Sequence, residues 1–431
     1  MIPEIEKASV VAIKAFQEKR LGETLQYLKA RSPYYQRVFT ENNIQISEIL
    51  SLEDLHKIPV TTKDHLQQFN DDFICVPRLE IIDYVTTSGT LGDPVTFALS
   101  DKDLDRLAYN EAISFECAGV GKEDILQLMT TMDRRFMAGL AYFLGARKLG
   151  AGIIRVGSGI PELQWDSILK FKPSYLITVP SFLLKLIESA HQRGIDPNDT
   201  SVKAAICIGE PIREQDFSLN ILSKKIKKDW NLELFSTYAS TEMSTAFNEC
   251  EYHVGGHHHP ELLIVEILDE NNKPVASDEV GELTITTLGV EAMPLLRFKT
   301  GDMVQAFRNP CGCGRNTLRL GPVVGRKKQM IKYKGTTLYP PAMYNILNGF
   351  SEIESYIIEI FHNELETDEI LIKIASANIS EELLQDIRDH FRAKLRVAPK
   401  IEFASIEEIQ ALKNPILSRK PVDFLDRRPI F

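Results

Sequence analysis

Between Tyr84 and Gly209, short apolar segments of strand length alternate with stretches of helical periodicity. The apolar segments are Ile125–Leu128, Gly152–Val156, Tyr175–Thr178 and Ala204–Ile208. One of the helical stretches is Ser181–Arg193. Strands and helices in alternation bury their apolar faces against one another, so this pattern predicts a sheet with helices packed on its faces. The chain is therefore expected to have an α/β fold.

The regions on either side of this core follow other patterns. Residues 1–80 are mostly helical in pattern, with breaks at Ser32-Pro33 and Ile58-Pro59. From Leu262 to Phe307, strand-like segments are separated by turn residues, which predicts a β-rich, barrel-like subregion. These segments are Leu262–Leu268, Gly281–Thr287 and Met303–Phe307.

A small α+β pattern follows the charged segment Arg326–Gln329. Its expected elements are the strands Ile353–Phe361, Glu369–Ile374 and Lys400–Phe403 and the amphipathic helix Ser380–Leu395, whereas Asn414–Phe431 is basic and loop-like. We therefore predict two domains. Residues 1–328 form a large domain of β-sheets flanked by helices with a β-barrel-like subregion, and residues 329–431 form a small, mobile α+β domain.

Composition limits the classes of partner. The chain has 60 acidic and 50 basic side chains and a net charge of −10 at pH 7, whereas a nucleic-acid surface requires a basic stripe. No apolar run reaches the roughly 18 residues of a membrane span. Met1–Arg20 has an amphipathic helical pattern, in which Glu4, Glu6 and Lys14 interrupt any signal-peptide core. We expect a cytoplasmic protein that binds neither nucleic acid nor membrane.

Two polar segments are rich in small residues and follow predicted strands. In Thr86–Pro94, hydroxyl residues and glycines follow the strand Ile81–Val85 and can close around phosphate oxygens, although an ordinary polar turn has the same composition. In Ile206–Pro211, a buried strand ends in Gly, Glu and Pro. That ending suits a turn approached closely by a ligand, and equally a plain strand-end turn.

Three further segments offer an aromatic ring, carboxylates and a guanidinium. In Phe235–Glu242, Tyr238 can stack on a base and Glu242 can bind Mg²⁺, or the segment is a surface loop with a buried Tyr. Asp302 follows a Gly turn and can accept hydrogen bonds from a ribose diol, or belongs to a Gly-Asp hairpin turn. Arg326 can bind phosphate or ribose, or lies on a basic solvated face.

In their order and spacing, these segments resemble the motifs of the adenylate-forming superfamily of acyl-CoA synthetases, and within it the phenylacetate–CoA ligase family. The resemblance extends from about Ser32-Pro33-Tyr34-Tyr35 to the C-terminus. The matching motifs are Thr-Ser-Gly-Thr-x-Gly-x-Pro (Thr87–Pro94), Gly-Glu-Pro (Gly209–Pro211), Tyr-x-x-Thr-Glu (Tyr238–Glu242), Arg-x-x-Thr-Gly-Asp (Arg297–Asp302) and Gly-Arg (Gly325, Arg326), together with Tyr142–Gly150, which is similar to that family's helix after its third strand.

The resemblance implies a site for ATP and Mg²⁺. Thr241 and Glu242 would be catalytic, with Thr241 touching the α-phosphate and Glu242 carrying Mg²⁺. Tyr238 would stack on adenine, and Asp302 would hold the ribose. The residues that the resemblance assigns to ATP are Ser88, Gly89 and Thr90 at the β- and γ-phosphates, with Gly209, Glu210, Pro211, Ser236, Thr237, Tyr238, Ala239, Ser240, Asp302 and Arg326.

The resemblance also assigns a catalytic lysine and a contact with CoA. Lys420 falls on the family's closing lysine, with Lys413 as the competing residue and a basic tail as the structural alternative. Positive charge is needed there because a carboxylate anion attacks a phosphate anion. After adenylation, the small domain would rotate about the linker near Lys328, so that Lys334 and Gly335 guide the CoA thiol.

Three positions depart from the family's motifs. Asp93 stands where Lys is usual, which removes one phosphate contact. Ala239 replaces a usual Gly and narrows the acid pocket, and Arg419 replaces the Gly before the closing lysine. These departures keep a non-catalytic nucleotide sensor as an alternative.

A Cys-x-Cys pair indicates a second kind of site. Cys311 and Cys313 lie on one tight turn, and with Cys250 and an upstream His they complete a Cys₃His set suited to tetrahedral zinc. Some phenylacetate–CoA ligase relatives carry a similar pattern, whose first His falls on His257. His253, in a Cys-x-x-His spacing, is the competing ligand, and reduced surface cysteines are the structural alternative. With four protein ligands, the zinc would be structural.

These observations predict an ATP-dependent acid–CoA ligase that adenylates an aromatic or arylacetic acid, with ATP, Mg²⁺, CoA and structural Zn²⁺ bound. The candidate walls of the acid pocket are Phe136, Tyr142, Phe143 and Ala239, although core packing explains the aromatic residues equally well. An adenylyltransferase with another acceptor is the second alternative. A homodimer would fit the family.

Overall fold

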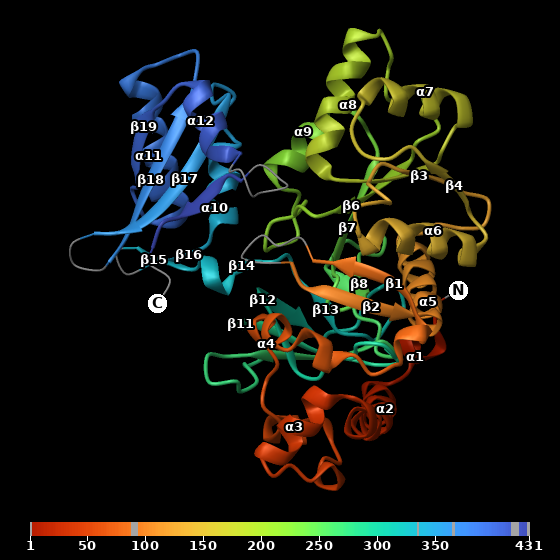
Figure 1. Ribbon diagram of the computed structural model, residues 1–431. Helices are drawn as coiled ribbons and strands as arrows, with labels where there is room; N and C mark the ends of the chain where they lie inside the picture. Colours follow the sequence, from red (N-terminus) through yellow and green to blue (C-terminus); the bar gives the residue numbers. More distant parts are fainter. Residues whose placement is uncertain (1, 88–93, 334–335, 364–366, 415–421, 429–431) are drawn as a thin grey trace. The chain divides into compact units, whose positions relative to one another are not determined.

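The computed structural model describes residues 2–87, 94–333, 336–363, 367–414 and 422–428, and it divides into two compact units (Figure 1). The first unit comprises Met1–Thr300 and Val304–Pro322, and the second comprises Gly301–Met303 and Val323–Phe431. The domain boundary after residue 328 and the mobility of the second domain stay predictions.

Five parallel strands form the centre of the first unit, in the order β7-β6-β5-β3-β4. Their bounds are β3 Ile125–Leu128, β4 Gly152–Arg155, β5 Tyr175–Thr178, β6 Ala204–Ile208 and β7 Glu233–Ser240. The strands predicted from the apolar segments are confirmed. Because these strands are parallel, their carboxyl ends share one edge of the sheet, where ligands bind in open α/β folds.

Helices cover both faces of the parallel strands, as the alternation predicted. They are α5 (Asp101–Cys117) and α6 (Met137–Leu149) on one face, and α7 (Pro161–Phe171), α8 (Pro180–Gln192) and α9 (Ile221–Asp229) on the other. Successive strand residues point to opposite faces. Ile177 and Ile206 therefore join the cluster of α5 and α6, while Leu176 and Ala205 join that of α7, α8 and α9.

Antiparallel strands continue the sheet beyond β7, in the order β8-β9-β13-β12-β11-β10, and β14 pairs with β12. Their bounds are β8 Thr245–Asn248, β9 Gly256–His257, β10 Leu263–Leu268, β11 Val280–Thr287, β12 Phe298–Phe307, β13 Arg319–Leu320 and β14 Gly325–Arg326. Among the described strands, β10 pairs only with β11, so the ladder does not close into a barrel. Gly301, expected in a turn, lies within β12 with a φ of 80°, which glycine adopts without strain.

The N-terminal residues are helical, as predicted, but the first helix is interrupted. Ser9 caps a new helix by accepting a hydrogen bond from the Ala12 N–H at 3.2 Å. The helices are α1 Glu4–Lys7, α2 Val10–Arg31, α3 Pro33–Glu41 and α4 Lys63–Gln68, with 3₁₀ turns at Ile46–Glu48, Leu52–Lys57, Asn70–Phe73 and Arg78–Glu80. An antiparallel pair follows, formed by β1 (Ile81–Thr86) and β2 (Thr96–Ser100).

The second unit is built on a mixed sheet of order β19-β18-β17-β20. Its elements are β17 Ser355–His362, β18 Asp368–Ala375, β19 Lys400–Phe403, β20 Phe424–Asp426, α10 Pro340–Leu347, α11 Glu381–Leu395, α12 Ile406–Lys413, the pair β15 Ile331–Tyr333 and β16 Thr336–Leu338, and the 3₁₀ turn Lys327–Gln329. The expectation of a loop throughout Asn414–Phe431 was wrong for β20. This strand pairs in parallel with β17, and Leu425 packs beside Ile357 in a small core.

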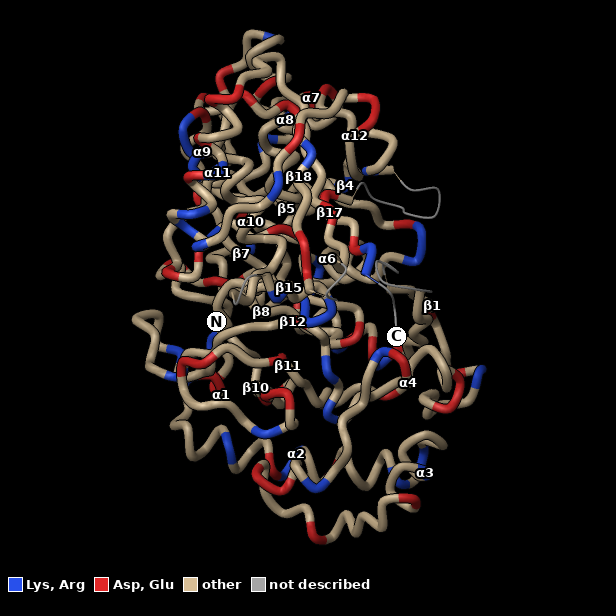
Figure 2. Tube along the Cα trace, turned by 90° about the vertical axis from the view of Figure 1, so that its left-hand side faces the viewer, with Lys and Arg blue, Asp and Glu red and all other residues tan. Residues whose placement is uncertain are grey.

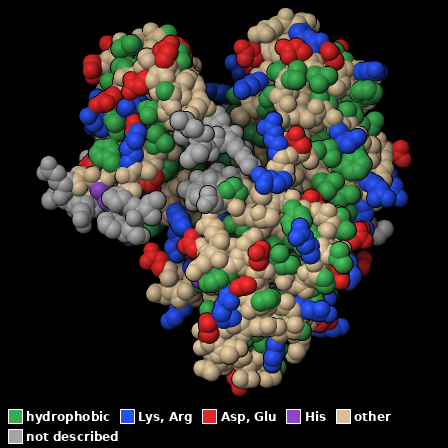
Figure 3. All heavy atoms as spheres, viewed as in Figure 1, with side chains coloured by type: hydrophobic (Ala, Val, Ile, Leu, Met, Phe, Trp, Pro, Cys, Tyr) green, Lys and Arg blue, Asp and Glu red, His purple; other side chains and the backbone are tan. Residues whose placement is uncertain are grey.

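Acidic and basic residues are interspersed along the described trace (Figure 2) and over the face of each unit drawn in Figure 3. In the part of the chain that the structure describes, no helix combines the length and apolarity that crossing a membrane requires.

Candidate active site and metal centre

Two of the predicted nucleotide segments leave the sheet side by side. The parallel pairing of Ile208 with Thr237 sets the ends of β6 and β7 in register, so Gly209–Pro211 and Tyr238–Glu242 lie at the same edge. Gly209 turns the chain with a φ of 75°, and no atom lies within 4 Å of the position that a Cβ would occupy. This edge is therefore an open place for a ligand to approach the backbone.

The turn between β7 and β8 holds two of the three predicted catalytic residues, Thr241 and Glu242. The Met243 N–H donates to Ser240 Oγ at 3.3 Å, and Ser244, with a φ of 49°, donates its hydroxyl to the Thr241 carbonyl at 3.2 Å. Thr241 and Glu242 are partly exposed. The Glu242 carboxylate makes no hydrogen bond or ion pair with the other described residues, so it is available to a cation.

A buried arginine that sequence reasoning missed holds this turn in place. The Arg106 guanidinium donates to the carbonyls of Ser244 (2.6 Å), Leu288 (2.8 Å) and Leu262 (2.7 Å), and to Thr245 Oγ1 at 3.1 Å. It therefore joins α5 to the turn and to two other segments of the sheet. The signal in the sequence is weak, because Arg106 is one of several charged and polar residues of α5, with Asp103 and Asn110 buried on the same side of the helix.

We expect Arg106→Met to lower the free energy of unfolding by about 3 kcal/mol, because buried carbonyls would lose their donors. Urea unfolding of the purified protein measures this. Arg193→Met is the matched control, since the Arg193 side chain lies at the surface and bonds Glu162 and Asp166 there, so its loss should change stability by less than about 1 kcal/mol. If the two substitutions lower the free energy of unfolding equally, Arg106 does not hold the turn in place.

The neighbouring nucleotide residues make contacts within the protein. Glu210 accepts hydrogen bonds at 2.9 Å from both the N–H and the hydroxyl of Ser181, in the first turn of α8. The Ser236 N–H donates to Glu249, and Thr237 bonds Asn248. In this structure these side chains and backbone groups stabilise the edge, whereas Tyr238 is partly exposed, with its ring 6.0 Å from that of Phe247, and Ala239 is exposed.

Asp302 and Arg326, which the sequence places around the ribose, lie together in the second unit. They face each other across the β12–β14 pair, and Arg326 Nε is 3.6 Å from Asp302 Oδ1. A carboxylate can accept hydrogen bonds from two hydroxyl groups, as the ribose assignment requires.

Several predicted residues lie outside the described residues, namely Ser88, Gly89, Thr90, Asp93, Lys334, Gly335, Arg419 and Lys420. The residues that flank the predicted phosphate loop are joined, because the Val95 N–H donates to Thr87 Oγ1 and the Thr87 N–H donates to the Val95 carbonyl, each at 3.0 Å. The Thr86 N–H donates to the Arg135 carbonyl in the loop after β3. The described residues on either side of the loop therefore lie together and contact the loop after β3.

The aromatic residues predicted for the acid pocket point in different directions. Tyr142 is buried with its ring 6.1 Å from that of Phe115, whereas Phe143 lies under the Arg155 guanidinium at 5.3 Å. Phe136 is 36% exposed and lines a shallow surface hollow of about 360 Å³ with Tyr84. Their assignment to the acid stays a prediction.

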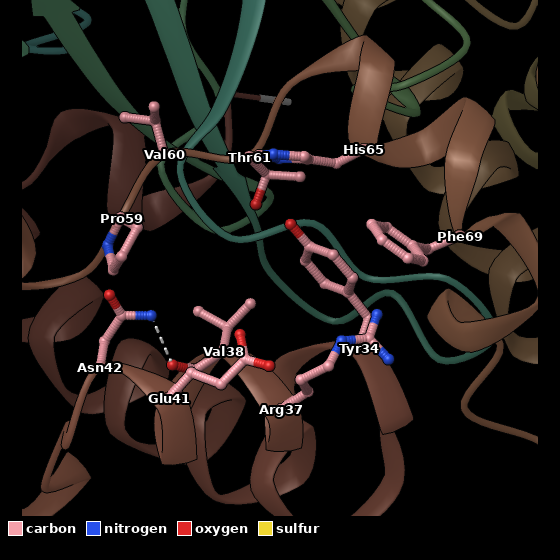
Figure 4. A pocket seen from close by; sticks show the side chains of 10 residues that line it. All are labelled: Tyr34, Arg37, Val38, Glu41, Asn42, Pro59, Val60, Thr61, His65 and Phe69. Carbon is pink, nitrogen blue, oxygen red and sulfur yellow. Dashed lines mark hydrogen bonds between the residues drawn. The ribbon is translucent and has the colours of Figure 1, made fainter.

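A larger hollow of about 480 Å³ opens among the N-terminal helices (Figure 4). Tyr34, His65 and Phe69 line one side of it, and Glu41 and Asn42, at the C-terminal end of α3, line the other. No residue predicted for ATP, CoA or the acid lines it. The predicted site does not include this hollow.

The predicted zinc ligands come together in the first unit. The ligand atoms of Cys250, His257, Cys311 and Cys313 all lie within 4.8 Å of one another. The Cys250 and Cys311 sulfurs are 3.7 Å apart, and Cys313 Sγ is 3.4 Å from His257 Nε2. Tetrahedral zinc, with bonds of about 2.3 Å to sulfur and about 2.0 Å to nitrogen, requires separations of about 3.8 and 3.5 Å. The residues present therefore fit zinc.

Neighbouring groups prepare these side chains as ligands. His257 Nδ1 bonds Thr317 Oγ1 at 3.0 Å, which leaves Nε2 facing the sulfurs, and burial lowers the pKa of His257 so that its ring is neutral. The hydrogen bond from the Cys250 thiol, aided by His257 and Arg315, holds the pKa of Cys313 well below its usual range. Metal ions bind cysteine as the thiolate and histidine as the neutral imidazole. Cys313 and His257 are therefore in the protonation states that a metal requires.

The alternative ligand His253 does not belong to this cluster. Its ring nitrogens lie 3.5 Å from carboxylate oxygens of Glu233 and Glu249, and its ring packs against Phe235 with centroids 5.0 Å apart. The spacing of residues in the sequence left the choice between the two histidines open. The pairing of β9 with β13 decides it, because it places His257 opposite Arg319, near the Cys-x-Cys turn.

Comparison with known proteins agrees with this geometry. The sequence profile described as AMP-binding enzyme matches residues 70–292, just over half of the chain. The chain therefore belongs to the AMP-binding enzyme family, and the resemblance to adenylate-forming enzymes is confirmed.

Within the family, the relatives found include phenylacetate-coenzyme A ligases. That of Thermus thermophilus is 29% identical over 391 residues, which cover 89% of this chain and 85% of the relative. That of Aromatoleum evansii is 26% identical over 445 residues, which cover 99% and 97%. The crystal structure of a 2-hydroxyisobutyryl-CoA ligase in the postadenylation state, with R3-HIB-AMP, superimposes with a TM-score of 0.83 at 23% identity, covering 98% of this chain and 91% of that one.

Proposed function

We propose that this chain is an ATP-dependent acid–CoA ligase that adenylates an aromatic or arylacetic acid and then transfers the acyl group to CoA, releasing pyrophosphate and AMP. The observation that carries this proposal is the shared edge of β6 and β7. There an open glycine turn, Tyr238 and an unengaged Glu242 carboxylate meet, in a member of the AMP-binding enzyme family.

The first step joins the acid to AMP. A carboxylate oxygen attacks the α-phosphorus of ATP, and the bond from that phosphorus to pyrophosphate breaks in line. Tyr238 stacks on adenine, Thr241 contacts the α-phosphate, and Asp302 binds the ribose hydroxyls. Glu242 holds Mg²⁺, which neutralises phosphate charge when bound. Lys420 adds positive charge where the two anions approach each other.

The second step forms the thioester. The CoA thiol gives up its proton, its sulfur attacks the acyl carbonyl carbon, and the bond to AMP breaks. The small domain rotates about the linker near Lys328 between the steps, and the Lys334-Gly335 loop guides the thiol. Relatives named phenylacetate-coenzyme A ligase, which match almost the full chain at 26–29% identity, support an arylacetic substrate and CoA as acceptor. A homodimer remains part of the proposal.

The Cys₃His cluster binds Zn²⁺ in a structural role. Its four protein ligands leave no open position for a substrate. The zinc links Cys250, after β8, to the Cys311–Cys313 turn between β12 and β13, and so supports the strands on which the Thr241-Glu242 turn is built.

Pyrophosphate release from ATP and Mg²⁺ tests the proposed activity. We expect one or more aryl or arylacetic acids in a panel to start release, and CoA to raise turnover with formation of one thioester and one AMP per pyrophosphate. If an acid starts release but CoA is not consumed, the acceptor is another group and the adenylyltransferase alternative is correct. If ATP binds and no acid starts release, the nucleotide sensor is correct.

A further inference from the structure

Glu111 places a carboxyl group in the contact between α5 and α6. Its side chain is 5% exposed, and a Cβ on Gly145 of α6 would lie only 2.2 Å from the Glu111 Cβ. Among the described residues, its single side-chain partner is Asn110, whose Nδ2 donates to Oε1 at 3.0 Å. The second carboxyl oxygen therefore has hydrogen-bonding capacity that the fold does not use.

Every other buried carboxyl group in the described residues has a cation or a backbone N–H beside it. These groups are Glu6 (His259, Arg315), Asp103 (N–H of Ser100, Glu291 and Ala292), Glu249 (Arg213), Glu282 (Lys299), Glu359 (Lys373, Arg427) and Asp368 (Arg428). Glu111 is the exception. It does not stabilise the fold in the way that the others do.

Burial without a charged partner keeps this group neutral. Desolvation raises the pKa of Glu111 to about 8, against the opposing hydrogen bond from Asn110. Removing a polar group from water costs free energy unless it is hydrogen-bonded, and an apolar side chain of similar size would pack here at no such cost. A carboxyl group retained at this place indicates a hydrogen-bonding partner that is not part of the protein.

The position of Glu111 suggests what that partner is. Asn110 Oδ1 accepts a hydrogen bond from the Ala246 N–H at 3.0 Å, and Ala246 pairs with Ala239 on β7, beside Tyr238. On the α6 side lies Tyr142, a buried residue whose hydroxyl makes no hydrogen bond with the other described residues. Burial and the nearby Glu111 both raise the pKa of Tyr142, which keeps this hydroxyl protonated.

We propose that Glu111 and Tyr142 form the polar end of the acid-binding pocket and select acids that carry a hydroxyl group remote from the reacting carboxylate. This inference rests on the proposed function, since it refines which acid is activated. The substrate hydroxyl accepts a hydrogen bond from the protonated second oxygen of Glu111 and donates its own to the Tyr142 hydroxyl oxygen. An acid without the hydroxyl would cover these two polar groups without offering either a partner, which strongly disfavours its binding.

The first arm of the test compares acids on the wild-type protein and needs no variant. Pyrophosphate release is measured with phenylacetate, the three ring-hydroxylated phenylacetates and 4-aminophenylacetate. We expect kcat/KM for the best hydroxylated acid to exceed that for phenylacetate by roughly 100-fold. A preference for unsubstituted phenylacetate would overturn the inference while leaving the ligase proposal in place. Release with none of the acids would overturn both.

The second arm assigns the preference to Glu111. Glu111→Gln keeps a polar group of the same size and should retain the preference, whereas Glu111→Leu should reduce it to about tenfold or less and raise the rate with phenylacetate. Glu261→Leu is the matched control. Glu261 is a part-buried carboxylate that accepts a hydrogen bond from Tyr109, which lies on α5 as Glu111 does. If Glu111→Leu unfolds, Tyr142→Phe replaces it with the same expectation. A preference that survives both substitutions contradicts the assignment.

Discussion

Lys420→Ala is expected to lower kcat for acid-dependent pyrophosphate release by roughly 10³-fold, with a much smaller change in KM for ATP. In the transition state, the attacking carboxylate and the α-phosphate share negative charge in a small volume, and a cation that contacts them only there lowers the barrier without tightening ground-state binding. The measurement is steady-state release with the best acid of the panel. Loss of ATP binding with kcat unchanged would mean that Lys420 binds the nucleotide instead.

Lys413→Ala is the control for this prediction, because Lys413 makes structural contacts within the second unit. Its ammonium lies 2.5 Å from Asp423 Oδ1 and 5.5 Å from the centre of the Tyr356 ring, and the side chain is 17% exposed. These contacts join α12 to the chain just before β20. Lys413→Ala should therefore lower the stability of the second unit and leave kcat within about twofold, since a part-buried ion pair contributes only about 1 kcal/mol.

The sequence predicted the central sheet well because its signal is local. Each of the segments Ile125–Leu128, Tyr175–Thr178 and Ala204–Ile208 is mostly apolar and is buried on both sides, as a strand covered by helices on two faces must be. β20 was missed for the opposite reason. It is three residues long in a basic segment, and it becomes a strand only because β17, far away in sequence, offers it an edge. No local pattern records such a pairing.

The same contrast holds for the candidate site. The two motifs near the carboxyl edge could be recognised because their order and spacing along the chain match those of the family. The parallel pairing of β6 with β7 then brings them together. Arg106 and Glu111 could not, because each is one of many charged and polar residues in Asp101–Cys117, and no local pattern marks them as buried. Their roles depend on the groups around them in the folded protein. Arg106 faces three carbonyls from distant segments, whereas Glu111 has Asn110 as a partner and no cation among the described residues.

The purified protein is expected to contain about one zinc ion per chain, and loss of that zinc should have the largest effect on stability of any change considered. Without a cation, the structure crowds three sulfur atoms and a neutral imidazole within 4.8 Å in a largely buried place. Zinc binding to such ligand sets is worth on the order of 10 kcal/mol in small domains. Elemental analysis and thermal unfolding with and without a strong chelator measure the content and its contribution.

Cys313→Ser tests the ligand set, and two variants serve as controls. The substitution replaces a thiolate ligand by a poorly ionised hydroxyl, so zinc content should fall well below one and the unfolding temperature should drop as it does with chelator. Cys207→Ala removes a buried cysteine far from the cluster in sequence, and His253→Ala removes the competing histidine; both should keep their zinc. Full zinc content in Cys313→Ser would falsify the Cys₃His assignment. The metal would join the segment after β8 to the turn between β12 and β13, and β8 follows the Thr241-Glu242 turn. Loss of the metal should therefore also displace this turn and slow adenylation. Added zinc should restore the rate in the wild-type protein and not in Cys313→Ser.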